Sequence, residues 1–308
     1  MELKAENFKG VWSAMSTPLT CDGKVDEDAL AKLIEHEVKL NVSGLFIAGT
    51  AGEGPVLSDS ERLKLAKLTV KHVAGRIPIA MQITDNSAQR MIEKLPAIEA
   101  TGVDIAVIAP PFFCLGNKQD YLLKLYTEVI NACNIPVGIY NLGKNNKTFV
   151  APETMAEILK NPKVVLVKDS SGSDDFMPVI LDAVKSRGGS LYALCGDEFN
   201  GLKYIQAGYD GLLWGGGCFN ALYGQEIIKL ALENKIEEAT KVQDRLVDVL
   251  FKVFGGKDIK CWLAGQKELM VRLGIFNTNT NLYGYTVTEE CSKGIDEVLQ
   301  TEKEYLLP

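Results

Sequence analysis

The chain has 308 residues, of which 33 are basic and 40 acidic, so its net charge is −7. Hydrophobic residues make up 46% and charged residues 24%, a composition that excludes a disordered or collagen-like protein. No apolar run reaches the roughly 20 residues that a membrane-spanning helix needs, so we expect no membrane partner. An acidic chain lacks the surplus of Lys and Arg on which non-specific nucleic-acid binding depends, so we expect no nucleic-acid partner.

Eight short apolar runs alternate with amphipathic stretches over the first two thirds of the chain. Most of the runs are continuous rather than alternating, which is typical of strands that are buried on both faces of a parallel sheet. The predicted strands span residues 11–14, 44–48, 78–83, 104–109, 136–140, 164–168, 191–194 and 211–214.

Helical patterns lie between these strands. Asp26 is the expected cap of the first helix, and Ser58 with Glu61 forms a capping box ahead of the second. The predicted helices span residues 26–40, a stretch from 58, then 87–100, 118–133, 152–159, 174–186 and 199–207. Further helical stretches follow at 221–254, with a break near 234, and at 258–273 and 288–304.

Eight strand–helix units predict a fold of the α/β class, a (β/α)8 TIM barrel with a C-terminal helical appendage. We place the barrel at residues 1–233 and expect residues 234–308 to form a helical extension that packs on it. The segment Phe254–Lys257 is interpreted as a turn inside this extension and not as a linker between domains.

Cysteine and histidine usage bears on cofactors and location. The seven cysteines include no Cys-x-x-Cys pair, which favours reduced, mostly buried thiols in a cytoplasmic enzyme. The N-terminal residues lack the apolar core of an export signal. The two histidines, His36 and His72, fall on predicted outer helices among charged residues. We therefore expect neither a histidine-based triad nor a metal site, and no cofactor.

Polar or glycine-rich segments follow five of the predicted strands. The carboxyl ends of barrel strands are where this fold places its active sites, so these segments are the candidate functional residues. They are Gly49–Gly54, Tyr140 with Asn141, Lys168 with the residues after it, Gly196–Asn200 and Trp214–Cys218.

Lys168 is the most informative of these residues because it closes the apolar run Val164–Lys168. Lysine is almost never fully buried without a partner or a function. Burial in a medium of low dielectric constant favours the neutral amine, which can attack a carbonyl carbon and form a Schiff base. A lysine paired with a carboxylate at the barrel rim is the alternative interpretation.

The other segments permit two interpretations each. Gly49–Gly54 predicts either a turn whose N–H groups and Thr50 hydroxyl bind an anion, or an ordinary turn before the next helix. Tyr140 can relay a proton or simply be a packed residue. The glycines of Trp214–Cys218 can bind a phosphate or leave room for a substrate chain, and the acidic pair Asp197–Glu198 argues against a phosphate.

Taken together, nine segments resemble the dihydrodipicolinate synthase / N-acetylneuraminate lyase family of pyruvate-dependent class I aldolases. Their order and spacing hold from about residue 8 to residue 300. The segments are Gly10–Pro18, Asp22–Asp26, Gly49–Arg62, Pro110–Phe113, Tyr140–Asn141, Lys168–Gly172, Gly196–Glu198, Gly208–Gly211 and Lys267–Gly274.

This resemblance implies roles for individual residues. Lys168 resembles the lysine that forms the Schiff base, Tyr140 the proton relay, and the turn at Thr50–Ala51 the site of the pyruvate carboxylate. The substrate-binding candidates are Thr50, Ala51, Ser170, Glu198 and Gly215. The resemblance also implies pyruvate or another 2-keto acid and an aldehyde as partners, and a homotetramer built as a dimer of dimers.

Three positions depart from the synthases of this family. Ala51 replaces a second hydroxyl residue, Phe113 stands where the synthases place a Tyr from the neighbouring subunit, and Asn145 stands where they have an arginine. These departures favour an aldolase that cleaves a 2-keto-3-deoxy sugar acid, or a similar hydroxy 2-keto acid, to pyruvate and an aldehyde. The alternatives are N-acetylneuraminate lyase, dihydrodipicolinate synthase, a hydratase-type or decarboxylating relative, a non-catalytic keto-acid-binding protein and a phosphate-recognising barrel enzyme.

Overall fold

The computed structural model describes residues 3–114 and 116–307, and in these residues eight parallel strands close into a barrel. Each strand pairs with the next one along the chain, and the last pairs with the first. The strands are β1 (Gly10–Ser13), β2 (Gly44–Ile47), β3 (Ile79–Gln82), β4 (Ile105–Ile108), β5 (Val137–Asn141), β6 (Val164–Asp169), β7 (Tyr192–Cys195) and β8 (Gly211–Trp214).

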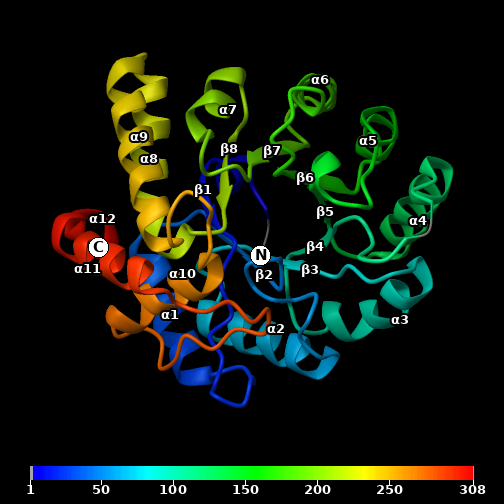
Figure 1. Cartoon of the computed structure of the whole chain (residues 1–308). Helices are drawn as coiled ribbons and strands as arrows, with labels where there is room; N and C mark the ends of the chain where they lie inside the picture. The colour runs from blue at the N-terminus through cyan, green and yellow to red at the C-terminus, as the bar shows by residue number, and fades with distance from the viewer. Residues whose placement is uncertain (1–2, 115, 308) are drawn as a thin grey trace.

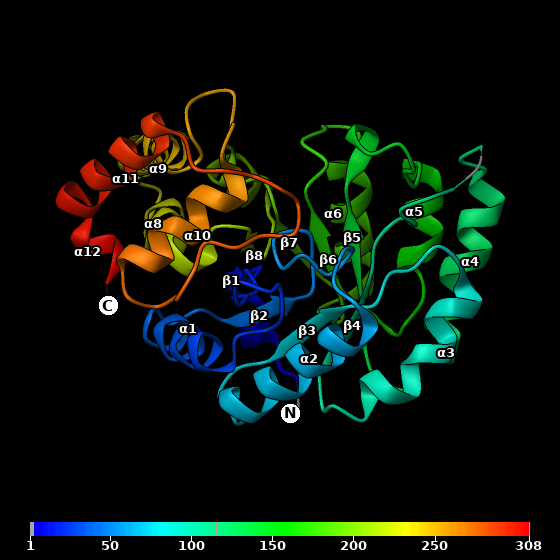
Figure 2. The same cartoon turned by 60° about the horizontal axis from the view of Figure 1, so that its bottom comes forward.

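Helices surround the barrel, as Figures 1 and 2 show. The first seven are α1 (Glu27–Lys39), α2 (Asp59–Val73), α3 (Ala88–Glu99), α4 (Gln119–Ala132), α5 (Pro152–Leu159), α6 (Phe176–Arg187) and α7 (Gly201–Ala207). They are followed by α8 (Gly217–Leu232), α9 (Ile236–Val253), α10 (Trp262–Arg272), α11 (Glu289–Thr301) and α12 (Lys303–Leu306). The short helices η1 (Ala5–Phe8) and η2 (Gly143–Asn145) complete the set. The predicted (β/α)8 TIM barrel with C-terminal helices is confirmed.

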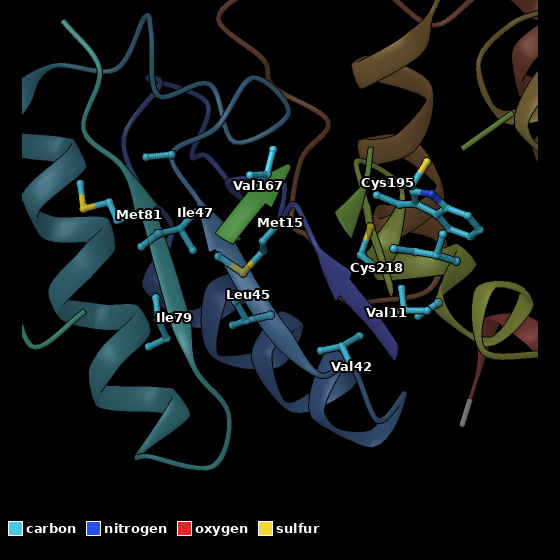
Figure 3. Packing of buried hydrophobic residues seen from close by; sticks show 14 of the residues in the cluster. Val11, Met15, Val42, Leu45, Ile47, Ile79, Met81, Val167, Cys195 and Cys218 are labelled. Atoms are coloured by element: carbon cyan, nitrogen blue, oxygen red, sulfur yellow. The ribbon is translucent and has the colours of Figure 1, made fainter. Parts of the chain in front are cut away.

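The strands are buried on both faces, which explains their continuous apolar runs. Residues such as Trp12, Phe46 and Leu166 fill the inside of the barrel. Their neighbours along the strands, among them Val11 and Leu45, pack outward beneath the helices (Figure 3). Successive side chains of a strand point to opposite faces, so the residues two positions after an inward-facing one also point inward.

The C-terminal helices gather on one side of the barrel (Figures 1 and 2). Helix α9 packs against α8 and α11, and α12 packs against α8. Gly265 of α10 allows a close approach to α9, because a Cβ there would overlap the carbonyl oxygen of Val253. None of the helices in residues 3–114 and 116–307 is long and apolar enough to cross a bilayer.

Several predicted details are wrong. Helix α8 begins at Gly217 rather than at residue 221. Its first turn lies directly against β1, and only a glycine fits there, because a Cβ at position 217 would lie 2.6 Å from the Cα of Ser13. Helix α10 begins at Trp262 rather than at 258. His36 lies on the outer helix α1, as predicted, but its side chain is buried and its Nε2 lies 2.8 Å from the carbonyl oxygen of Cys218. Burial lowers the pKa of His36.

Candidate active site

Lys168 and Tyr140 lie side by side at the carboxyl ends of β6 and β5, where their Cα atoms are in register. Both side chains point into the barrel and are only 5% and 6% exposed. The Nζ of Lys168 lies 4.5 Å from the centre of the Tyr140 ring and 5.0 Å from that of Phe46. Among the residues that the structure describes, Lys168 makes no ion pair, so the interpretation as a rim lysine paired with a carboxylate is not supported.

A cavity of about 650 Å³ opens above Lys168 at the carboxyl end of the barrel. The structure brings every predicted site residue to its wall, although they come from five different strand ends. These residues are Thr50 and Ala51 after β2, Tyr140 on β5, Lys168 and Ser170 at the end of β6, Glu198 after β7 and Gly215 after β8.

The turn after β2 carries Thr50 and Ala51, and its glycines provide room rather than unusual backbone angles. The left-handed residues are Ala48 and Glu53, with φ of 53° and 58°. A Cβ at Gly54 would overlap the carbonyl oxygen of Ala48. Glu53 and Gly54 donate their N–H groups inside the turn, each over 3.1 Å. The predicted turn after β2 is confirmed.

A buried ion pair fixes this turn from behind. Glu53 and Lys267 of α10 contact each other with both side chains completely buried. Lys267 also donates to the carbonyl oxygen of Thr280 over 2.7 Å, and Glu53 accepts the N–H of Leu282. Burial lowers the pKa of Lys267. The pair therefore holds the β2 turn, helix α10 and the segment 280–282 together.

Glu198 places a carboxyl group in the cavity wall. It accepts the N–H of Gly216 over 2.5 Å, and burial raises the pKa of its side chain to about 7. Gln243 of α9 donates to its backbone oxygen over 3.0 Å. The carboxyl group of Glu198 thus occupies an N–H at the start of α8 that a phosphate would otherwise bind. This end of the helix therefore does not favour phosphate binding. Gly215 keeps the adjacent space open, since a Cβ there would lie 3.3 Å from the Glu198 Oε1.

Asp169 supports the ends of β5 and β6 from the side opposite Lys168. Its buried carboxyl group accepts hydrogen bonds from Asn141 Nδ2 over 3.0 Å, from the Tyr209 hydroxyl over 2.7 Å and from the Ser171 N–H over 3.0 Å. Burial raises the pKa of Asp169 despite these donors. The network fixes the backbone on either side of Ser170 and keeps Lys168 in register with Tyr140.

The outer wall of the cavity was missed by the sequence analysis. Its residues are Phe254, Asp258, Ile259, Trp262 and Tyr285. On the barrel side it meets Gly172, Asp197 and Phe199, which belong to segments that the sequence analysis had singled out. The ring of Trp262 meets that of Tyr285 edge to face, with centroids 5.6 Å apart. Ile259 has a φ of 53°, which is rare for a β-branched residue. Aromatic residues on both sides of Gly255-Gly256 were the available signal for this wall.

A closed (β/α)8 barrel with a buried lysine beside a tyrosine at its mouth is the architecture of a class I aldolase. Enzymes of this class are carbon–carbon lyases that work through a lysine Schiff base. The chain belongs to the dihydrodipicolinate synthetase family, because the model of that family matches residues 7–298.

Individual relatives agree with this assignment. A 4-hydroxy-tetrahydrodipicolinate synthase of Exiguobacterium sibiricum is 28% identical over 252 residues, which cover 80% of this chain and 83% of the relative. The dihydrodipicolinate synthase of Bacteroides thetaiotaomicron has a solved structure that superposes with a TM-score of 0.85 at 26% identity, covering 95% of this chain and 98% of that one. An E. coli K12 prophage protein, solved in complex with pyruvate, shares the fold with a TM-score of 0.84 at 21% identity, over 96% and 99% of the two chains.

Proposed function

We propose that this enzyme reversibly cleaves a 2-keto-3-deoxy sugar acid, or a similar hydroxy 2-keto acid, to pyruvate and an aldehyde through a Schiff base on Lys168. The observation that carries the proposal is the position of the Lys168 amine. It lies at the floor of the cavity, 4.5 Å from the ring of Tyr140, and makes no ion pair within the described part of the chain. An amine in such a place is free to attack a keto carbon.

The chemistry balances with Lys168 and Tyr140 as the reacting groups. The Lys168 amine adds to C2 of the keto acid, and the Tyr140 hydroxyl gives its proton to the departing water, which leaves a protonated imine and a phenolate. The phenolate takes the proton of the C4 hydroxyl while the C3–C4 bond breaks. The electron pair of that bond enters the imine to form an enamine, and the aldehyde leaves.

Release of pyruvate reverses the first steps. Tyr140 returns its proton to C3, which restores the imine, and then takes a proton from the water that adds to C2. Collapse of the resulting adduct frees pyruvate and the Lys168 amine. The Thr50 hydroxyl and the backbone at Ala51 orient the substrate carboxylate from the opposite wall, so that C2 meets the amine.

The departures from the synthases support a substrate other than that of lysine biosynthesis. Ala51 lines the cavity but carries no hydroxyl group for the carboxylate. The Phe113 ring has no proton to pass, and it is 67% exposed in the single chain. The sequence places Asn145 where the synthases carry an arginine. Each difference removes a group that the synthases use, while the lysine and the tyrosine are kept.

Trapping with borohydride tests the role of Lys168. Borohydride reduces the imine that pyruvate forms, and intact mass with peptide mapping then locates the adduct. We expect one reduced adduct on Lys168, none in Lys168→Arg, and a normal adduct in Lys144→Arg, which changes an exposed lysine. An adduct on another lysine, or full pyruvate release by Lys168→Arg, would contradict the proposal.

A substrate panel tests the aldehyde half. We expect pyruvate release from 2-keto-3-deoxy sugar acids to exceed both release from N-acetylneuraminate and condensation of pyruvate with aspartate semialdehyde. A preference for either of the last two reactions would replace the proposed substrate while leaving the Schiff-base chemistry in place.

We also propose a homotetramer. Two neighbouring rings after β4, Phe112 and Phe113, are 46% and 67% exposed in the single chain, and Phe113 stands at the position where the synthases have a Tyr that reaches the neighbouring subunit. An exposed apolar pair of this kind suits an interface between copies. Light scattering of the purified protein should give four times the mass of one chain.

A further inference from the structure

We infer that the cavity selects keto acids whose distal end is an uncharged polyol and rejects keto acids that end in a second carboxylate. The inference rests on the proposed function and narrows its substrate class. It follows from the charges and the ring surfaces that line the cavity beyond Lys168.

The cavity wall carries more negative than positive groups. Among its described lining residues, three bear a carboxyl group, Asp197, Glu198 and Asp258, and Lys168 alone bears an amine. Lys168 is committed to the keto carbon of the substrate, where the single positive charge of the imine balances the carboxylate beside it. No lining cation then remains for a second carboxylate.

The carboxyl groups nearest the barrel are held by uncharged donors. Asp197 accepts the N–H of Phe199 over 3.1 Å and the amide of Asn200 over 2.8 Å, and Glu198 accepts the N–H of Gly216. Within the described residues neither makes an ion pair. The one described cation that acts on Glu198 is Lys168, which is committed to the imine, so a second substrate carboxylate in this part of the cavity would meet like charges.

The third carboxyl group of the wall has a lysine neighbour, but this lysine adds little positive charge to the cavity. Asp258 lies 3.6 Å from Lys260, and both side chains are largely exposed, so this pair is screened by solvent. The neighbouring Lys257 lines a different hollow, which it shares with Glu289 and Glu290. The described residues at the outer end of the cavity therefore provide no cation that could bind an anion.

The same wall is suited to a chain of hydroxyl groups. Carboxylates accept hydrogen bonds from hydroxyl groups, so Asp197 and Glu198 can bind the polar edge of a polyol. Phe199, Phe254, Trp262 and Tyr285 offer ring surface for its C–H groups. A cavity of about 650 Å³ is within the size range of sites for small molecules, so a six-carbon keto acid fits.

A matched pair of substrates tests the inference. 2-keto-3-deoxygluconate and 2-keto-3-deoxyglucarate differ only at C6, which is a hydroxymethyl group in the first and a carboxylate in the second. We expect kcat/KM for pyruvate release to favour the first by about tenfold or more at pH 8 and low ionic strength, and the ratio to shrink when salt is added.

Two variants locate the cause of the selectivity. Glu198→Gln keeps an oxygen that accepts the N–H of Gly216 but removes the charge, so the ratio should fall several-fold even if both rates change. Asp182→Asn removes a charge of the same sign from an exposed position on α6 that does not line the cavity, so its ratio should match that of the wild type.

The outcomes separate this inference from the proposed function. If pyruvate forms the borohydride adduct on Lys168 but the dicarboxylate is cleaved as well as the monocarboxylate, only the inference is wrong. If the adduct forms and neither keto acid is cleaved, a polyol end is not what the cavity accepts, and the inference is again wrong. If no adduct forms on Lys168, the proposed function itself fails.

Discussion

The amine of Lys168 is held by aromatic rings and not by a carboxylate. Phe46 and Tyr140 meet edge to face with centroids 5.8 Å apart, and the lysine lies against both rings. Attraction between an ammonium group and a ring is worth about 0.5–2 kcal/mol, much less than breaking a buried ion pair costs. A reaction at this amine therefore breaks no ion pair among the described residues.

The hydroxyl group of Tyr140 can be tested separately from its ring. Tyr140→Phe keeps the ring that packs on Phe46 and Lys168 but removes the proton relay. We expect kcat to fall by about 10²–10⁴-fold, while borohydride still traps pyruvate on Lys168. Tyr126→Phe is the control, because the hydroxyl of Tyr126 on α4 is buried and has no hydrogen-bond partner in the part of the chain that the structure describes. A Tyr140→Phe enzyme within tenfold of the wild-type rate would rule out the relay.

At the scale of elements, the pair of Glu53 and Lys267 joins two distant parts of the chain. It connects the turn after β2, which lines the cavity, with α10, whose first residue, Trp262, lines the outer wall. The segment 280–282 is bound to the same pair, shortly before Tyr285 reaches the cavity. The β2 side and the outer wall of the cavity are thus joined by one buried contact.

Removing one partner should leave a buried charge without compensation. We expect Lys267→Met to lower the free energy of unfolding by about 3–5 kcal/mol, as measured by urea denaturation. The double variant Glu53→Gln/Lys267→Met removes both charges and should recover most of that loss. Equal stabilities of the single and double variants would show that the two side chains do not act as a pair.

The strands and the reacting residues could be predicted because each carries a local signal. Each predicted strand boundary agrees with the structure to within one residue. Lys168 and Tyr140 were identifiable because a polar residue at the end of a buried strand must lie at the barrel mouth.

The outer wall and the buried pair carry no such signal. Trp262 and Tyr285 reach the cavity only because the chain folds back after the barrel is complete, and the pattern around Gly255-Gly256 indicates a turn but not its direction. Glu53 and Lys267 look like ordinary surface charges in the sequence. Their pairing depends on tertiary packing that no helical or strand periodicity describes.

At the scale of the whole molecule, a buried carboxyl group lies where the beginning and the end of the barrel meet. Glu37 of α1 accepts a hydrogen bond from the hydroxyl of Ser13 on β1 over 2.7 Å, and its other oxygen has no hydrogen-bond partner among the described residues. Burial, and to a smaller extent the charge of Glu37, raises the pKa of the nearby Cys218 thiol on α8. Burial raises the pKa of Glu37 to about 8 from an ordinary value of 4.5.

This shift makes stability depend on pH. Between about pH 4.5 and pH 8 the native state holds the Glu37 proton while the unfolded state has lost it, so the free energy of unfolding falls as pH rises through this window. Glu37→Gln keeps an oxygen for Ser13 and removes the ionisation. We expect the variant to gain stability relative to the wild type between pH 5 and pH 9, on the order of a few kcal/mol.

Urea denaturation at both pH values measures this gain. Glu238→Gln is the control, because it changes an exposed glutamate on α9 and should leave the pH dependence of the wild type unaltered. If Glu37→Gln and the wild type lose stability in parallel as pH rises, ionisation of Glu37 is not coupled to folding.

The position of Trp262 gives the enzyme a built-in optical reporter. Of the three tryptophans, Trp12 and Trp214 are fully buried, and Trp262 lines the cavity beside Tyr285. A ligand that fills the outer cavity changes the surroundings of this indole and leaves the other two untouched. Tryptophan fluorescence in a stopped-flow experiment would therefore report when the aldehyde end of the substrate reaches the outer wall. Absorbance of the imine would separately report when the bond to Lys168 forms.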